Sequence, residues 1–312
     1  MLLLKHELSV CVLTANRGAI LMKRCPWFLL AVLLVGGAPG ARAQDPSIVT
    51  DGFHSTPGFT TKKAVASGMA GTIMLGTLVD SYFSWWKDAE KPFSFLEHNY
   101  ESWLGGSHQG LDKVGHFFGT YVLFKSIRNI LLWGGCDRST ALWWGAGYAF
   151  SNGLETEIGD GFSPYGFDYQ DLIFDIGGVA FGLLQTDVPF LQNFDFKFSF
   201  WSTAGFKSPA NFTTDYDAMT IWLTANVHNL LPAAVREYWP EFLRLGVGYS
   251  VDDRETRREV AVGLDISIEN LFRAPNEEVL MVQRALDILH LPLPAVKFTQ
   301  GKVPRYFLAH RD

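Results

Sequence analysis

Apolar residues recur at helical spacing through the first half of the chain and at alternate positions through the second half. The helical spacing predicts four helices, over residues 63–86, 109–133, 139–158 and 168–186. None of them offers about 20 uninterrupted apolar residues, which favours a packed bundle over single membrane spans. Small residues at i and i+4, as in the Gly115–Gly119 and Gly178–Gly182 pairs, predict close contacts between these helices.

From about residue 188 the period changes from 3.6 to 2. Strands are predicted over 196–203, 220–227, 243–251 and 259–268, with a short helix near 274–289 and a final strand or two. In each run the apolar residues share one face, and we expect that face to be buried. The predicted fold class is therefore α+β: a bundle of about four apolar helices, then an antiparallel β region with one short helix.

The glycines in the strands lie opposite the apolar face, a pattern that also suits strands of outer-membrane barrels. Such a barrel needs at least eight strands, and the pattern supplies only five or six. A sheet covered by the helices fits better, as does a partial barrel leaning on a membrane.

The N-terminus has the pattern of an export signal. Lys23-Arg24 precede an apolar core from Trp27 to Val35, and Ala41-Arg42-Ala43 form a small-x-small cleavage site. We expect residues 1–43 to be a signal peptide with an N-terminal extension, because Met22 would begin a signal of ordinary length. Residues 44–62 are then a lead-in, 63–187 the helical bundle and 188–312 the β region.

Charge and cysteine content limit the function classes. Without residues 1–43 the chain keeps 21 of 26 basic and 31 of 32 acidic residues, a net charge of −10. Nucleic-acid binding is not expected of such an acidic chain. Of Cys11, Cys25 and Cys136, only Cys136 would remain after cleavage, so no internal disulfide is expected. Cys25 precedes the apolar core and therefore cannot be a lipidated cysteine at the cleavage site.

Polar residues at helical spacing mark the candidate site. Residues three or four apart share one helix face, so each segment offers a small polar cluster on an apolar helix. If three such faces meet, they enclose carboxylates and one imidazole; the candidate catalytic residues are Asp112, His116, Glu157, Asp160 and Asp171. Asp175, four residues after Asp171, lies on the same predicted face.

Three roles remain open for this cluster. Asp112, His116, Glu157 and Asp160 could bind a divalent metal, since carboxylates suit Mg²⁺, Mn²⁺ or Ca²⁺ and an imidazole admits Zn²⁺ or iron. The cluster could instead serve acid–base hydrolysis of an envelope lipid or glycan, with Glu157 or Asp160 activating water. A purely structural network is the third role, with Asp112 capping its helix and Lys113 neutralising a carboxylate.

The residues around the cluster also resemble a known family. The YfiM-like family of predicted periplasmic lipoproteins, whose activity is not established, is similar over roughly 80–270. The motifs that carry this resemblance are Ser84-Trp85-Trp86, Asp112-Lys113-Val114-Gly115-His116, Glu157-Ile158-Gly159-Asp160-Gly161-Phe162-Ser163 and Asp171-Leu172. Longer members of the family are also similar at Asp215-Tyr216 with Thr220-Ile221-Trp222-Leu223 and at Gly246-Val247-Gly248-Tyr249. VanZ-like membrane proteins have a comparable acid–histidine helix, although Asp175 stands where they tend to have asparagine. The resemblance implies a location in the envelope.

The sequence thus predicts an exported protein of the periplasm or envelope membrane of a Gram-negative-type bacterium. Its expected role is that of a membrane-associated or accessory protein with a buried Asp/His/Glu cluster between helices. Membrane or other envelope components are the expected partners. A metal-dependent or acid–base hydrolase acting on envelope lipid or glycan is the alternative.

Overall fold

A computed structural model describes residues 49–50, 52–87, 91–97, 107–200, 215–252 and 256–308. The expected signal peptide (1–43) lies outside these residues, as does part of the lead-in. The fold is α+β, with the helices preceding a six-stranded antiparallel sheet as the sequence predicts. The long helices are α2 (Thr61–Ser81), α4 (Leu111–Trp133), α5 (Arg138–Gly161) and α6 (Tyr169–Asp187).

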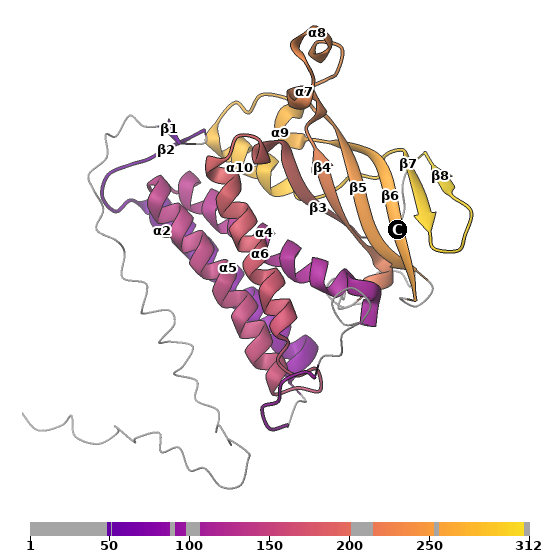
Figure 1. Ribbon diagram of the computed structural model, residues 1–312. Coiled ribbons are helices and arrows are strands. Elements are labelled where there is room, and N and C mark those ends of the chain that lie inside the picture. The colour runs from indigo at the N-terminus through magenta and orange to yellow at the C-terminus, as the bar shows by residue number, and fades with distance from the viewer. Residues whose placement is uncertain are drawn as a thin grey trace, which may run out of the picture.

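Helix α4 is the centre of the bundle. It contacts α2, α5 and α6 on one side and the sheet on the other (Figure 1). Most of its side chains are buried or half-buried, and Gly119 is its one exposed residue. A π-helical turn, η1 (Tyr82–Trp86), follows α2, and the short 3₁₀ turn η2 (Ser107–Gly110) leads into α4.

Glycines decide how closely α6 approaches α4. A Cβ at Gly178 would lie 2.1 Å from the Phe117 carbonyl oxygen, and one at Gly182 would lie 2.4 Å from the Phe124 ring. The expectation of a close helix contact at this pair is confirmed. It is wrong for Gly115 and Gly119, because no atom of the described residues lies within 4 Å of a Cβ built there.

The sheet has the order β3-β4-β5-β6-β7-β8, so each strand pairs antiparallel with its neighbours in sequence. Its strands are β3 (Phe194–Phe200), β4 (Met219–Ala225), β5 (Leu243–Asp252), β6 (Arg257–Ile266), β7 (Ala295–Thr299) and β8 (Arg305–Phe307). The predicted short helix is α10 (Glu277–Leu286). The minor elements are β1 (Val49–Thr50) and β2 (Phe53–His54), which pair with each other, η3 (Leu191–Asn193), η4 (Tyr216–Ala218), α7 (Val227–Leu230), α8 (Ala233–Arg236) and α9 (Ile268–Leu271).

The apolar residues of the strands do share one face, but the prediction that this whole face is buried is wrong. Cross-strand pairing places Val247 beside Val262 on the apolar face, where Leu245 and Val247 are 42% and 51% exposed. The opposite face is the buried one. Its residues include Lys197, Thr220, Trp222, Thr224, Arg244, Ser250, Glu259, Ala261, Asp265, Lys297 and Thr299.

The sheet curls around its polar face. Beyond α10, the Phe198 amide donates to the Ile288 carbonyl (2.9 Å) and the His290 amide donates to the Phe198 carbonyl (2.8 Å). The segment that leads into β7 therefore runs along the free edge of β3, at the opposite side of the sheet. His290 stacks on Trp222 at 3.8 Å between ring centroids, which fills the concave side. Glycines permit this curl, since a Cβ at Gly248 would lie 2.8 Å from the Thr220 methyl carbon.

The helices cover the β3–β4 part of the apolar face and the end of β5. Phe117 and Phe118 of α4 pack against Phe196 and Phe198 of β3, at 4.9 and 5.8 Å between ring centroids. Leu111, Met219, Ile221 and Val251 form the buried centre of this contact. Elsewhere on this face of β5 to β7, Leu245, Val247, Val260, Val262 and Phe298 stay exposed.

The glycine contacts predict different outcomes for two alanine substitutions on facing helices. Gly178→Ala should lower the free energy of unfolding by about 1–3 kcal/mol, because its methyl group overlaps Phe117 and Thr120. Gly119→Ala should be neutral or stabilising by up to about 1 kcal/mol, because alanine favours a helix and the position is open. Denaturant unfolding of both variants checks this, and equal losses would contradict the packing described.

Candidate functional site

The site begins at the first turn of α4. His108 and Gln109 have positive φ values of 63° and 52°, and Gly110 has a φ of 81°. The sheet and η4 fix this bend, since the Tyr249 hydroxyl of β5 donates to the Gln109 carbonyl (2.5 Å) and the Tyr216 ring of η4 stacks on His108 at 4.0 Å between ring centroids. Strained backbone of this kind persists only where the surroundings hold it.

Asp112 is not a helix cap. Gly110 occupies the N-cap position without a capping side chain, and Asp112 instead accepts a hydrogen bond from the Tyr216 hydroxyl (2.6 Å). Its carboxylate is therefore fixed by the 3₁₀ turn that leads into β4.

Lys113 joins α4 to the start of α6. Its Nζ lies 2.7 Å from Asp168 Oδ2 and 2.6 Å from Asp171 Oδ1, and all three side chains are at least nine-tenths buried. Asp168 is the N-cap of α6, with its Oδ1 accepting from the Gln170 amide (2.7 Å). Breaking such a buried pair by removing one partner costs about 3–5 kcal/mol, because the remaining charge is uncompensated.

His116 lies at the centre of the carboxylates. Its Nδ1 is 3.3 Å from both Asp175 oxygens and 3.7 Å from Glu157 Oε1. On the other side of the ring, Nε2 lies 3.9 Å from Asp112 Oδ1 and 3.9 Å from Asp171 Oδ2. One imidazole thus has two carboxylates near each nitrogen.

These contacts form two sets with the spacing of metal ligands. Asp112, His116 and Asp171 make one set, and His116, Glu157 and Asp175 the other, with the ligand atoms of each within 4.8 Å of one another. The first set opens to solvent, since the side chains of Asp112 and His116 are 25% and 18% exposed. The second set is enclosed, and among the described residues none donates a hydrogen bond to Glu157 Oε1.

Burial and crowding displace the pKa values of these groups. Burial raises the pKa of Glu157 to about 8 and that of Asp171 to about 7, with the nearby positive groups only partly offsetting it. At His116 burial opposes the charged form, but the carboxylates of Asp175, Asp171 and Asp112 outweigh it and raise the pKa well above its usual value. The cluster therefore holds more negative groups than Lys113 and His116 can balance, and it retains protons near neutral pH.

Asp160, the remaining predicted residue, stands apart from both sets. Its Oδ1 accepts a hydrogen bond from Trp86 Nε1 of the π-helical turn (2.8 Å). Burial raises the pKa of Asp160 to about 6. The structure thus brings Asp112, His116, Glu157 and Asp171 together and places Asp160 against Trp86.

Two carboxylates of the cluster were not among the predicted site residues. The sequence could have assigned Asp175 to the site, because it follows Asp171 by four residues on the same helix face. Asp168 carried only the signal of a helix N-cap, and its approach to Lys113 depends on how α6 packs against α4. Glu157 contacts the same N-cap, because its Oε2 accepts a hydrogen bond from the Asp168 amide (2.9 Å).

Residues 100–187 match a family described as "Predicted periplasmic lipoprotein (DUF2279)". The match supports the resemblance to predicted periplasmic lipoproteins over this part of the chain, which is shorter than the 80–270 inferred from the motifs. It includes α4, α5 and α6, and with them every residue of both ligand sets. No curated protein and no solved structure is significantly similar to the chain.

The raised pKa of Glu157 predicts a pH-dependent stability in the presence of a chelator. Because the folded state holds this proton up to about pH 8, its stabilising contribution is complete below the usual carboxyl pKa of 4.5 and is lost as the pH rises toward 8. His116 acts in the same direction, since its contribution is complete below pH 6.5 and is lost above that. A difference of one in pKa corresponds to about 1.4 kcal/mol.

Glu157→Gln removes the carboxyl titration and should therefore flatten the fall in the free energy of unfolding between pH 5 and 8. Urea unfolding at several pH values checks this. Glu237→Gln changes an exposed carboxyl on the β side of the chain and serves as the control. Parallel profiles for Glu157→Gln and the parent protein would contradict the assignment.

Proposed function

We propose that this protein is a membrane-associated component of the bacterial cell envelope, with an apolar outer surface that rests against lipid. The single observation that carries the proposal is the inverted polarity of the bundle. Charged groups are buried around His116 and Lys113, beside the apolar core of the bundle, whereas the outer faces of its helices carry apolar side chains.

The inversion is consistent along α5 and α6. The exposed residues of α6 from 170 to 186 are Ile173, Ile176, Ala180 and Leu184, and those of α5 from 141 to 160 are Trp143, Gly147, Phe150 and Ile158. Trp143 and Leu184 are 63% and 54% exposed. Water-facing helices normally carry charges on this side, whereas large exposed apolar surfaces mark contact with a membrane or a partner.

The outer surface of α2 is uncharged and mainly apolar as well. Its exposed residues between Ala64 and Val79 include no charged side chain. By length and composition, Thr61–Trp86 is one helix that could cross a membrane, and only 17% of its most apolar 18-residue stretch is buried in the structure. The exposed valines and leucines of β5 and β6 add an apolar sheet surface with a polar interior behind it.

The expected location supports the same proposal. The sequence has an export-signal pattern before residue 44, and the family matched by residues 100–187 is described as periplasmic. Within the envelope, a lipid surface is the partner whose chemistry suits an uncharged apolar face.

The membrane proposal predicts that the mature protein cofloats with phospholipid vesicles. The double substitution Ile173→Lys with Ile176→Lys should weaken this association by more than about tenfold, since each buried isoleucine contributes about 1.5–3 kcal/mol. Both positions are exposed in the structure, so folding should be retained.

Val235→Lys with Tyr238→Lys, on and just after α8 at the top of the molecule in Figure 1, is the matched control, because it also adds two lysines at exposed positions away from the helix face. It should leave vesicle association unchanged. A folded parent protein that stays in the aqueous fraction would overturn the proposal.

A second candidate function, hydrolysis that depends on a divalent cation, is favoured by the geometry of His116. Carboxylates and one imidazole at ligand spacing suit a hard or borderline cation. Such a cation would balance the excess negative charge and complete the contacts of Glu157 Oε1. The opening at Asp112 would admit water, and a bound cation makes water a stronger acid and its hydroxide a nucleophile for an ester or glycosidic bond.

Metal analysis of the purified protein tests this second candidate. The parent should bind about one equivalent of Mn²⁺ or Zn²⁺, and His116→Ala and Asp175→Asn should each weaken binding by at least about tenfold. Asp160→Asn is the matched control, because Asp160 bonds to Trp86 outside both ligand sets. Unchanged metal binding in a folded His116→Ala variant would exclude this site.

A further inference from the structure

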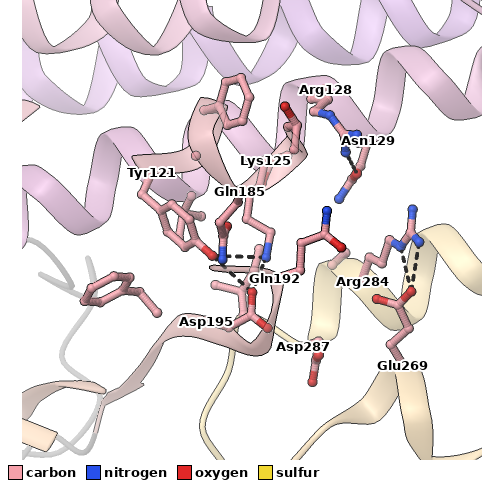
Figure 2. A pocket seen from close by; sticks show the side chains of 18 of the residues that line it. Tyr121, Lys125, Arg128, Asn129, Gln185, Gln192, Asp195, Glu269, Arg284 and Asp287 are labelled. Atoms are coloured by element: carbon pink, nitrogen blue, oxygen red, sulfur yellow. Dashed lines mark hydrogen bonds and ion pairs between the residues drawn. The ribbon is translucent and has the colours of Figure 1, made fainter. Parts of the chain in front are cut away.

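A second polar site lies between the bundle and the sheet, away from His116. It is a cavity of about 460 Å³, bounded by α4, the end of α6, β3, the start of β5, and α10 (Figure 2). This volume is within the range of small-molecule pockets. From its lining we propose that the cavity binds a polyol phosphate, meaning a phosphate ester whose remaining groups are hydroxyls.

The left wall of the cavity in Figure 2 is built around Asp195 of β3. Its Oδ1 accepts from Lys125 Nζ (2.5 Å) and from the Tyr121 hydroxyl (3.1 Å), and its Oδ2 pairs with Arg244. These positive groups hold the pKa of Asp195 well below its usual value despite burial. Asp195 is therefore already committed to two cations, and it would not repel a bound anion as a lone carboxylate would.

Of the other three acids that line the cavity, Glu241 is exposed to solvent, and Glu269 and Asp287 are paired. Glu269 accepts from Arg284 at 2.8 and 3.0 Å. Asp287 accepts from Lys197 Nζ at 2.8 Å and from the Ile268 amide at 2.7 Å. Glu269 and Asp287 thus link the elements that form the cavity.

The opposite side of the cavity is rich in hydrogen-bond donors. Arg128 and Asn129 of α4 and Arg284 of α10 lie around the same space, and Gln192 lies between them and the Lys125–Asp195 pair (Figure 2). Burial, and then the charges of Arg284 and Arg138, lower the pKa of Arg128 to about 10. An anion bound between the two guanidinium groups would relieve this repulsion.

The chemistry of the lining selects the ligand. Guanidinium groups bind phosphate through paired N–H donors, and side-chain amides such as Asn129 and Gln192 both donate to and accept from hydroxyls. A hydrocarbon ligand would offer these polar groups no hydrogen bonds in place of water. A free polyol phosphate and the headgroup of a phosphoglycerol lipid share this chemistry.

Calorimetric titration of the mature protein with glycerol 3-phosphate tests the site, beside cosedimentation with phosphatidylglycerol or phosphatidylcholine vesicles. Arg128→Gln and Arg284→Gln should each weaken binding at least tenfold. Arg236→Gln removes the same charge from exposed α8 and should leave binding unchanged. Gln192→Glu adds a negative charge at an exposed position of the lining, so it should weaken binding tenfold without disturbing the buried walls.

Binding of the soluble phosphate that depends on these residues would support the site with a free ligand. Preference for phosphatidylglycerol over phosphatidylcholine vesicles, lost in Gln192→Glu, would support it with a lipid headgroup. If the folded parent binds neither probe, or if Gln192→Glu binds as the parent does, the proposal is wrong.

Discussion

The ion pairs of Lys113 are the interaction on which the helical half of this protein depends. They join the first turn of α4 to the first turn of α6, and so fix how the two helices lie against each other. In this register Asp175 faces His116, and Gly178 and Gly182 meet α4 closely enough to exclude larger residues. A buried lysine needs such partners, and its partners in turn crowd the carboxylates around one imidazole.

In both halves of the fold, charged side chains are buried and apolar side chains lie on the outer surface. In the bundle, α5 and α6 direct isoleucine, leucine and aromatic side chains outward. In the sheet, the concave polar face is filled by the Trp222–His290 stack and by the Lys197–Asp265 pair at 2.9 Å. Val247, Val260 and Val262 of β5 and β6 face outward. Both halves of the fold thus bury charged groups and expose apolar side chains, and contact with lipid would explain this arrangement.

Much of this could be predicted from the sequence. Periodicity located the four helices and the main strands, and helical spacing placed Asp112, His116, Glu157 and Asp171 on faces that meet. Periodicity could not say which face of the sheet is buried, because alternation is the same for either choice and only the curl of the strands decides it. Nor could it find Asp195, whose partners Lys125 and Arg244 come from distant elements.

The most direct test of the central claim, contact of the apolar faces with lipid, is the environment of a spin label on α6. With Cys136→Ser removing the native thiol of the mature chain, Ile176→Cys would carry the label on the exposed face, and Val235→Cys would carry it on α8. In vesicles, the label at 176 should be more accessible to oxygen than to a polar nickel chelate, with the reverse order at 235. A label at 176 that the nickel chelate reaches as readily as it reaches 235 would contradict the account.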